Sequence, residues 1–184
     1  HFATTSRDDL SIRDVYKKCS ERKMRNVGGP LITYKRTHHT GTLFQCLSAT
    51  KVGDCTHPQC KYMLRARNGT EILNPYVSET VDMTFSPFGD SGNYTARYYS
   101  KYADMNVTLM LEMKDKANTC FVVWARNSDL ENGCELIVKY SALNNISADC
   151  LNYYTTYCTA DSVNLYNPNC NYTNVEDVPG YPNC

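Results

Sequence analysis

The sequence predicts an all-β fold with flanking helices, built on an antiparallel meander of eight strands that forms a barrel or a sandwich. Two observations predict it. From Leu31 to about residue 140, apolar and polar residues alternate with a period of two. Turn sequences such as "RNGT", "SPFGDSG" and "SDLENG" divide this region into short segments. With 184 residues, the chain is long enough for one domain with a real core, so a single domain over 1–184 is expected.

The elements follow from local patterns. Residues 8–23 predict a short helix in an N-terminal segment, 1–30, because acids lie at its start and bases at its end. A second helix is predicted over 147–162, with Ser147 as its N-cap. Residues 163–184 have no helical period and are expected to be a tail held by disulfides. The strands are predicted at 31–37, 41–50, 60–67, 76–85, 93–101, 105–114, 118–126 and 134–140.

Composition excludes several classes of protein. The 19 basic and 19 acidic residues give a formal charge of zero, which argues against a nucleic-acid binder and a polybasic membrane anchor. No stretch approaches the roughly 18 apolar residues of a membrane span. The histidines show no metal-ligand spacing and there is no G-x-S-x-G elbow. We therefore expect no enzyme, no cofactor and no metal.

The cysteines and the glycosylation sequons predict secretion. There are 10 cysteines, an even number, and the chain begins with His1 rather than Met, as expected of a processed mature form. Glycosylation is predicted at the five Asn-X-Ser/Thr sequons, which begin at Asn68, Asn93, Asn106, Asn145 and Asn171. Together these features predict an extracellular protein with paired cysteines.

The sequons also orient the strands, because a glycan must point to solvent. With Asn93 and Asn106 outward, alternation turns inward Tyr94, Ala96, Tyr98, Tyr102, Val107, Leu109, Leu111 and Met113. In 76–85 the inward set is Val77, Glu79, Val81, Met83 and Phe85. A buried acid such as Glu79 needs a partner or a cationic ligand. This inner face predicts a cavity lining, whereas Trp124 is expected to pack on the same face as Val122.

The C-terminal third carries a recognisable pattern, "CFVVWARNSDLENGCELIVKYSALNNISADCLNYYTTYC…NPNC". A strand cysteine is followed by Cys-Glu-Leu leading a strand, a cysteine opening a helix, and a cysteine after an Asn-rich turn. Together with "ITYKRTHHTGTLFQC" at 32–46, this resembles the tick salivary lipocalins that bind histamine or leukotrienes. The resemblance implies an eight-stranded up-and-down barrel over 31–140, with one open end and the C-terminal helix packed on it.

The resemblance also implies two disulfides, Cys46–Cys170 and Cys120–Cys150. The five-residue spacing of "CTHPQC" makes a local Cys55–Cys60 pair possible. Among the remaining cysteines, Cys19 is expected to pair with either Cys134 or Cys158.

For the ligand, the family pattern is only half present. In members that capture biogenic amines, an Asp follows the strand cysteine and an aromatic residue follows Glu-Leu. Here Phe121 and Ile137 occupy those positions, so the resemblance implies a lipid: a leukotriene, a fatty acid or a sterol. The alternatives are a biogenic amine, histamine or serotonin, held by Glu79, Glu135 and Tyr98, and an immunomodulator that acts on a host protein or cell surface. Loops 50–60 and 86–92 would serve the last role.

Glu135 allows two orientations. It faces solvent with Leu136 and Val138 inward, or it faces the cavity while those two pack on the helix, as the resemblance implies. Arg36, Arg65 and Arg67 are candidates for a ligand carboxylate, or are ordinary surface arginines. The predicted ligand-binding residues are Tyr34, Arg65, Glu79, Val81, Phe85, Tyr94, Tyr98, Leu109, Phe121, Glu135 and Ile137. The expected protein is a secreted monomer of saliva that sequesters a small host mediator.

Overall fold

The structure is a computed structural model that describes residues 29–88, 93–127 and 132–172. The predicted helix at 8–23, Cys19, Cys184 and most of the predicted tail lie outside these residues. Among the helices that the structure describes, none has the length and apolar character needed to cross a membrane.

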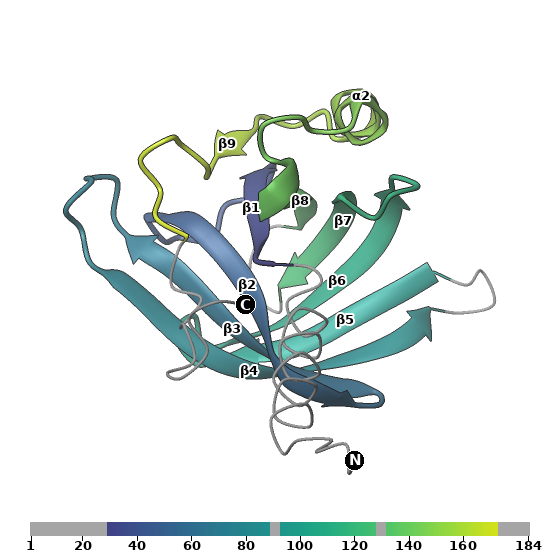
Figure 1. Ribbon diagram of the computed structural model, residues 1–184, viewed down its shortest axis with the longest axis horizontal. Coiled ribbons are helices and arrows are strands. Elements are labelled where there is room, and N and C mark those ends of the chain that lie inside the picture. Colours follow the sequence, from purple (N-terminus) through teal and green to yellow (C-terminus); the bar gives the residue numbers. More distant parts are fainter. Residues whose placement is uncertain (1–28, 89–92, 128–131, 173–184) are drawn as a thin grey trace, which may run out of the picture.

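Eight antiparallel strands form one closed barrel (Figure 1). They are β1 (Leu31–Arg36), β2 (Phe44–Thr56), β3 (Gln59–Asn68), β4 (Tyr76–Phe88), β5 (Asn93–Ser100), β6 (Met105–Lys114), β7 (Cys120–Asn127) and β8 (Gly133–Lys139). From β2 to β8 each strand pairs with the next along the chain, and β1 pairs with both β8 and β2. The predicted eight-stranded meander is thus confirmed, and it is a barrel.

β-Bulges in β1 and β6 reverse the alternation within these strands, and β2 also shifts register against β3. In β1, Thr33 lies opposite Ile137 but Lys35 lies opposite Leu136, so Tyr34 is an extra residue. Tyr34 lies outside the barrel, on the same face as Ile32, where it stacks on Tyr166 at 5.3 Å, so the prediction that it faces a ligand is wrong.

The bulge in β6 has the same effect between Leu111 and Met113. Met113 packs against the core outside the barrel, so its predicted inward orientation is wrong. Beyond the bulges, Arg36 in β1 and Lys114 in β6 line the interior. The bulges in β1 and β6 therefore each bring to the inner face a cation that strict alternation would place outside.

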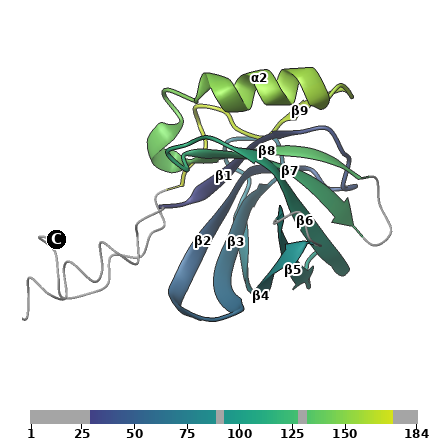
Figure 2. The same cartoon turned by 90° about the vertical axis from the view of Figure 1, so that its right-hand side faces the viewer.

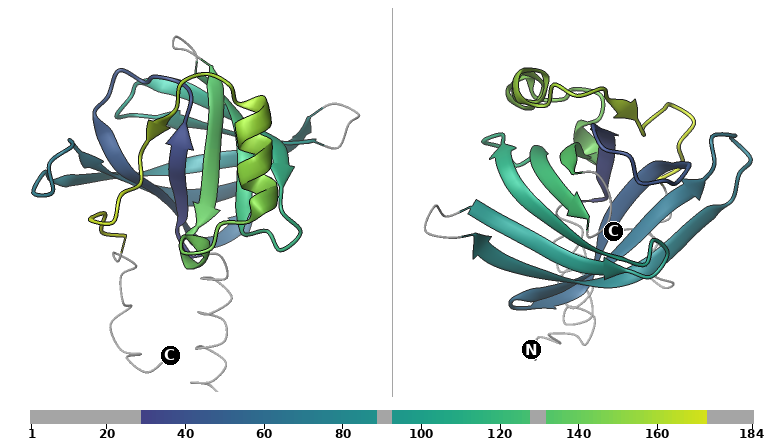
Figure 3. Two further views of the ribbon diagram at one scale, coloured as in Figure 1. Left: turned by 90° about the horizontal axis from the view of Figure 1, so that it is seen from above. Right: turned by 180° about the vertical axis from the view of Figure 1, so that it is seen from behind.

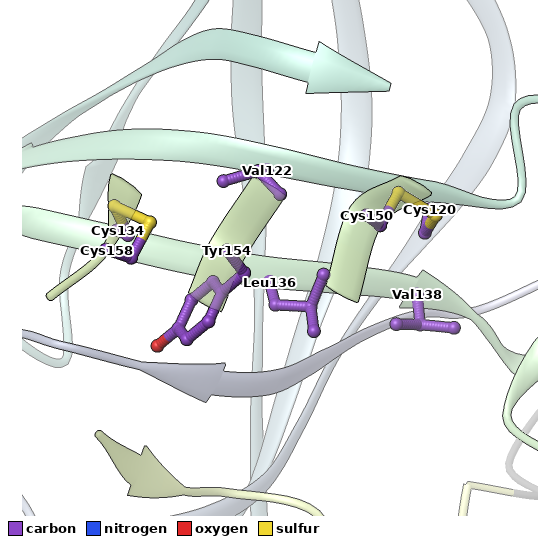
Figure 4. Close-up of a cluster of buried hydrophobic side chains, with 8 residues drawn as sticks. All are labelled: Cys120, Val122, Cys134, Leu136, Val138, Cys150, Tyr154 and Cys158. Carbon is purple, nitrogen blue, oxygen red and sulfur yellow. A yellow bond between two sulfur atoms is a disulfide. The ribbon is translucent and has the colours of Figure 1, made fainter. Parts of the chain in front are cut away.

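A single α-helix among the described residues, α2 (Ala148–Tyr157), packs on the outer face of the barrel (Figures 2 and 3). It begins after Ser147 as predicted, without a side-chain cap hydrogen bond, and ends five residues before the predicted end. A 3-10 turn, η2 (Tyr140–Ala142), connects β8 to the segment before the helix. The helix closes a buried core formed by Cys120, Val122, Cys134, Leu136, Val138, Cys150, Tyr154 and Cys158 (Figure 4). Trp124 packs against this core with Val122, as expected.

Disulfides fasten the helix and the following segment to the barrel. Cys120–Cys150 and Cys134–Cys158 join β7 and β8 to the two ends of α2. Cys46–Cys170 joins β2 to the segment after the helix, and Cys55–Cys60 closes the β2–β3 hairpin. The expected pairing of Cys19 with Cys134 or Cys158 is wrong, because the end of α2 lies over the start of β8 and brings those two cysteines together.

The segment after α2 continues along the barrel. Its two-residue strand β9 (Val163–Asn164) pairs with β1. Arg67 is 1% exposed and donates hydrogen bonds to Asn169 Oδ1 and to the carbonyl oxygens of Gly69 and Thr70. Arg67 is therefore a structural residue, neither a surface arginine nor a ligand group.

Candidate functional site

The barrel encloses a cavity of about 590 Å³, lined from all eight strands. Its wall is mostly hydrocarbon and aromatic. Phe121 and Ile137, opposite each other in the β7–β8 pair, form part of this wall together with Leu31, Leu64, Phe85, Leu109 and Leu111. Such a lining suits the apolar body of a small molecule.

Most of the predicted ligand-binding residues line the cavity. They are Arg65, Glu79, Phe85, Tyr94, Tyr98, Leu109, Phe121, Glu135 and Ile137. Val81 is buried, 4% exposed, but does not line the cavity, and Tyr34 lies outside the barrel. Contact of these residues with a ligand stays a prediction.

Glu135 faces the cavity. Leu136 and Val138, its neighbours in the outward alternation, are fully buried beneath α2. One oxygen of the carboxylate, Oε1, lies 2.8 Å from Nε2 of His38. The negative charge that opens β8 therefore points inward and already has a protein partner.

His38 is held over Glu135 by the chain that continues β1. The Thr37 N–H donates to the carbonyl of Cys134 at 2.9 Å, and the Cys134 N–H donates to Thr37 Oγ1 at 2.9 Å. A Cβ on Gly133 would lie 2.9 Å from the Cβ of His38 and 3.0 Å from its backbone nitrogen, so this position requires glycine. The imidazole is 1% exposed, and its Nδ1 has no hydrogen-bond partner among the described residues.

Arg36 is a buried cation beside this pair. It lies opposite Glu135 in the β1–β8 register and is 5% exposed. One terminal nitrogen donates to Thr40 Oγ1 at 2.9 Å, while Nε has no partner, and no described carboxylate lies within salt-bridge distance. Burial lowers the pKa of the guanidinium, and Glu135 and Tyr98 oppose that shift. The option of an ordinary surface arginine is wrong here.

Glu79 and Tyr98 complete the polar part of the wall. The Glu79 carboxylate accepts hydrogen bonds from Ser100 Oγ, from the Lys101 N–H at 2.9 Å and from the Tyr102 N–H at 3.4 Å. These protein groups are the partners that the sequence required for an inward acid. Burial raises the pKa of Tyr98, and the nearby Glu135 and Glu79 raise it further, so its phenol stays neutral at physiological pH.

The other two cations of the wall are engaged elsewhere. The Arg65 guanidinium lies 3.8 Å from the ring centre of Tyr76 and donates to the carbonyl of Asn171. Lys114, at the end of β6, donates to Asn118 Oδ1 at 2.7 Å. Arg36 is thus the cavity cation whose hydrogen bonds within the described residues are least complete.

The sequence does not indicate a role for His38, and it leaves open whether Arg36 faces solvent or a ligand. The histidine spacing predicts no metal site and gives His38 no other role. Both residues follow the bulge at Tyr34, where strict alternation fails. The adjacent pair His38-His39 gives no indication that the first is buried and the second exposed.

The predicted glycosylation sites agree with solvent access. The side chains of Asn68, Asn106, Asn145 and Asn171 are exposed, and Asn93 begins β5. Their modification stays a prediction.

A closed antiparallel barrel with a helix on its outer face and a cavity inside is the lipocalin fold. The model of the tick histamine-binding protein family matches residues 31–172, and the chain belongs to this family of tick lipocalins. No curated protein matches the chain. Among solved structures, the chain is similar to Japanin from Rhipicephalus appendiculatus bound to cholesterol, with a TM-score of 0.55 and 14% identity over 78% of this chain and 95% of Japanin. At that identity the likeness concerns the fold.

Proposed function

We propose that this lipocalin sequesters an acidic lipid, a fatty acid or a leukotriene, with the hydrocarbon chain in the barrel and the carboxylate at Arg36. The observation that carries the proposal is the buried guanidinium of Arg36, which lines an apolar cavity without a carboxylate partner among the described residues.

The cavity supports an apolar body of moderate size. Its volume of about 590 Å³ lies within the range of roughly 300–1,000 Å³ typical of small-molecule sites. Phe121 and Ile137 replace the acid and the aromatic residue of the amine-binding pattern, and they lie opposite each other in the sheet. A long hydrocarbon chain gains free energy against this wall, at about 25 cal/mol per Å² of apolar area removed from water.

The charges of the wall favour an anionic head group. Glu135 is partnered by His38, and Glu79 by Ser100 and two backbone N–H groups. Arg36 interacts with Glu135 only through charge, and its guanidinium forms one hydrogen bond, to Thr40, with Nε left without a partner among the described residues. A buried donor without a partner is costly. A ligand carboxylate would supply a charge-assisted hydrogen bond. A sterol, which has no anionic head, would leave Arg36 as it is.

A biogenic amine is the second candidate, and one observation favours it. Glu79 and Glu135 both line the cavity and both act on the ionisation of Tyr98, so two carboxylates lie near one phenol. An amine would have to compete with His38 for Glu135 and with Ser100 for Glu79. Because of this competition, we propose the amine only as the second candidate ligand, after the acidic lipid.

The proposed setting is tick saliva. We propose that residues 1–184 act as one secreted, glycosylated, monomeric lipocalin domain that lowers the free concentration of a host mediator by binding it. A separate contact with a host protein or cell would use the exposed β2–β3 hairpin, residues 51–59, which the Cys55–Cys60 disulfide closes.

A ligand pair that differs only in its head group tests the proposal. Oleic acid and oleyl alcohol are titrated into the protein by displacement of a fluorescent fatty acid, with histamine as a third ligand. We expect the acid to bind more tightly than the alcohol, and Arg36→Gln to weaken the acid at least about thirtyfold while changing the alcohol little, because a buried charged hydrogen bond is lost.

The matched control is Arg97→Gln, because Arg97 is an exposed arginine of β5. This variant should leave both affinities unchanged. Equal loss of acid and alcohol in Arg36→Gln, or tight histamine binding that Glu135→Gln abolishes, would overturn the proposal.

A further inference from the structure

We infer that the Arg36–His38–Glu135 cluster binds the acidic head group together with one proton, which His38 takes up as the ligand enters. This inference rests on the proposed function, since it concerns the same cavity and a carboxylate ligand. It makes the affinity for an acidic lipid depend on pH in the range where imidazole titrates, while a neutral lipid of the same length binds independently of pH.

His38 is buried near two ionisable groups, Arg36 and Glu135. The imidazole touches Glu135 through Nε2 at 2.8 Å and is 1% exposed, so bulk water does not solvate it. Its Nδ1 is buried without a partner among the described residues. A second proton on the ring, at Nδ1, would therefore be a buried donor that lacks an acceptor in the empty site.

The net charge of the cluster explains the coupling. With a neutral imidazole, Arg36 and Glu135 cancel. A ligand carboxylate adds one negative charge in a cavity of mostly hydrocarbon wall, and a net charge there is unfavourable. Protonation of His38 restores neutrality. The positive ring then lies between Glu135 and the ligand, where it reduces the repulsion between the two carboxylates.

The remaining charged and titratable groups do not replace His38 in this role. Tyr98, from β5, stays neutral because burial and the nearby acids raise its pKa. Glu79, from β4, is held by Ser100 and two backbone N–H groups. Arg65, from β3, is engaged by Tyr76 and Asn171, and Lys114 lies at the end of β6. Tyr154, from α2 outside the barrel, also feels Glu135, and burial raises its pKa.

The sign of the effect follows from linkage. Binding that takes up a proton tightens as pH falls, by at most about tenfold per pH unit for one proton. Imidazole is the side chain whose protonation changes between about pH 5 and 8, so the measurements cover that range.

The experiment measures dissociation constants from pH 5.5 to 8.5 for three ligands of equal chain length: a fatty acid, its alcohol and its alkyl sulfonate. The sulfonate keeps its charge over the whole range, so a change in its affinity reports on the protein. We expect the acid and the sulfonate to bind at least about tenfold more tightly at pH 6 than at pH 8, and the alcohol to change less than about twofold.

His38→Gln should remove this pH dependence, and His39→Gln, at the exposed neighbouring histidine, should keep it. Calorimetry of the unaltered protein in buffers of different ionisation enthalpy gives a second readout, an uptake of up to one proton near pH 7 for the acid and none for the alcohol. This readout does not depend on the variants folding.

Two results separate the failure of this inference from that of the proposed function. If the acid binds but shows the same pH dependence as the alcohol, or if His38→Gln keeps the dependence, proton uptake at His38 is overturned while the lipid function stands. If neither the acid nor the alcohol binds at any pH, both proposals are overturned.

Discussion

The two faces of β7 and β8 have different roles: the outer face packs against α2, and the inner face lines the cavity. On the outer face, Val122, Leu136 and Val138 are fully buried under α2 between two disulfides (Figure 4). On the inner face, their neighbours Phe121, Glu135 and Ile137 line a cavity. Substitutions on the outer face should therefore act on folding, and those on the inner face on binding.

This division explains how the barrel keeps an unfilled interior. An open cavity forgoes the dispersion contacts that a packed core provides. The helix, the outward side chains and the disulfides supply a second core on the opposite side of the sheet. The predictions below test this separation, from the largest expected effect to the smallest.

Leu136→Ala should cause the largest loss of stability. Leu136 is fully buried beneath α2, and truncation of such a leucine lowers the free energy of unfolding by about 2–5 kcal/mol. Urea unfolding of the variant and the parent measures this loss, provided that the two proteins have the same m-value. A loss below 1 kcal/mol would mean that the outer core does not carry the fold.

Removal of the Cys134–Cys158 disulfide by Cys134→Ser with Cys158→Ser should lower the free energy of unfolding by about 3 kcal/mol, given the 24-residue separation of the two cysteines. The control is the double serine variant of Cys55 and Cys60. The disulfide that it removes joins residues with a sequence separation of 5, so the variant's free energy of unfolding should fall by about 2 kcal/mol. Denaturant titration of the two double variants compares their free energies of unfolding. A larger loss from the hairpin variant would contradict the assignment of stability to the helix side.

Ile137→Ala should give the opposite profile to Leu136→Ala. Its side chain lines the cavity, so we expect less than about 1 kcal/mol of lost stability but a loss of roughly fivefold to thirtyfold in fatty-acid affinity, from the removal of hydrocarbon contact. Unfolding and displacement titrations on the same preparation check both values. Equal affinity for the variant and the parent would place the ligand away from this wall.

Asp115→Asn should cause a smaller, pH-dependent loss. Burial alone would raise the pKa of Asp115, but hydrogen bonds from the Thr119 side chain and from the backbone N–H groups of Cys120 and Thr119 outweigh it and lower that pKa. The stabilisation is therefore present above the ordinary aspartate value, near pH 4, and is lost as pH falls through the lowered value.

We expect Asp115→Asn to lose about 1–2 kcal/mol at pH 7 and to converge on the parent in strong acid. Urea unfolding at neutral and acidic pH measures the two limits. A constant difference between variant and parent at all pH values would contradict this role of the carboxylate.

The smallest effect concerns Trp124, the single tryptophan of the chain. It packs on the outer core and does not line the cavity, so its fluorescence should report unfolding but change little when ligand binds. A large change on addition of fatty acid would mean that the two faces are coupled.

The sequence predicted most of the barrel because period-two alternation and turn residues are local signals. Seven strands were expected within three residues of their observed ends, whereas β2 runs to Thr56, six residues past its predicted end. Alternation predicted that Glu79 faces the interior, and the family pattern predicted the same for Phe121 and Ile137. The inward orientation of Glu135 came from the family pattern, since alternation alone allowed both faces. The structure agrees with all four inward orientations.

What the sequence did not reveal depends on two bulges and on barrel closure. One extra residue at Tyr34 reverses the alternation beyond it, so Lys35 turns outward, over the ring of Tyr154, and Arg36 turns inward. The contact of His38 with Glu135 joins residues 97 apart in sequence. It forms only when β1 pairs with β8, and no local pattern encodes that pairing.

The most direct test of the central claim is native mass spectrometry of the deglycosylated protein, titrated in parallel with a leukotriene, histamine and serotonin. The account predicts one bound leukotriene per chain, lost in Arg36→Gln and kept in Arg97→Gln, with no comparable uptake of either amine. Histamine or serotonin bound in preference to the leukotriene, and lost in Glu135→Gln, would contradict it.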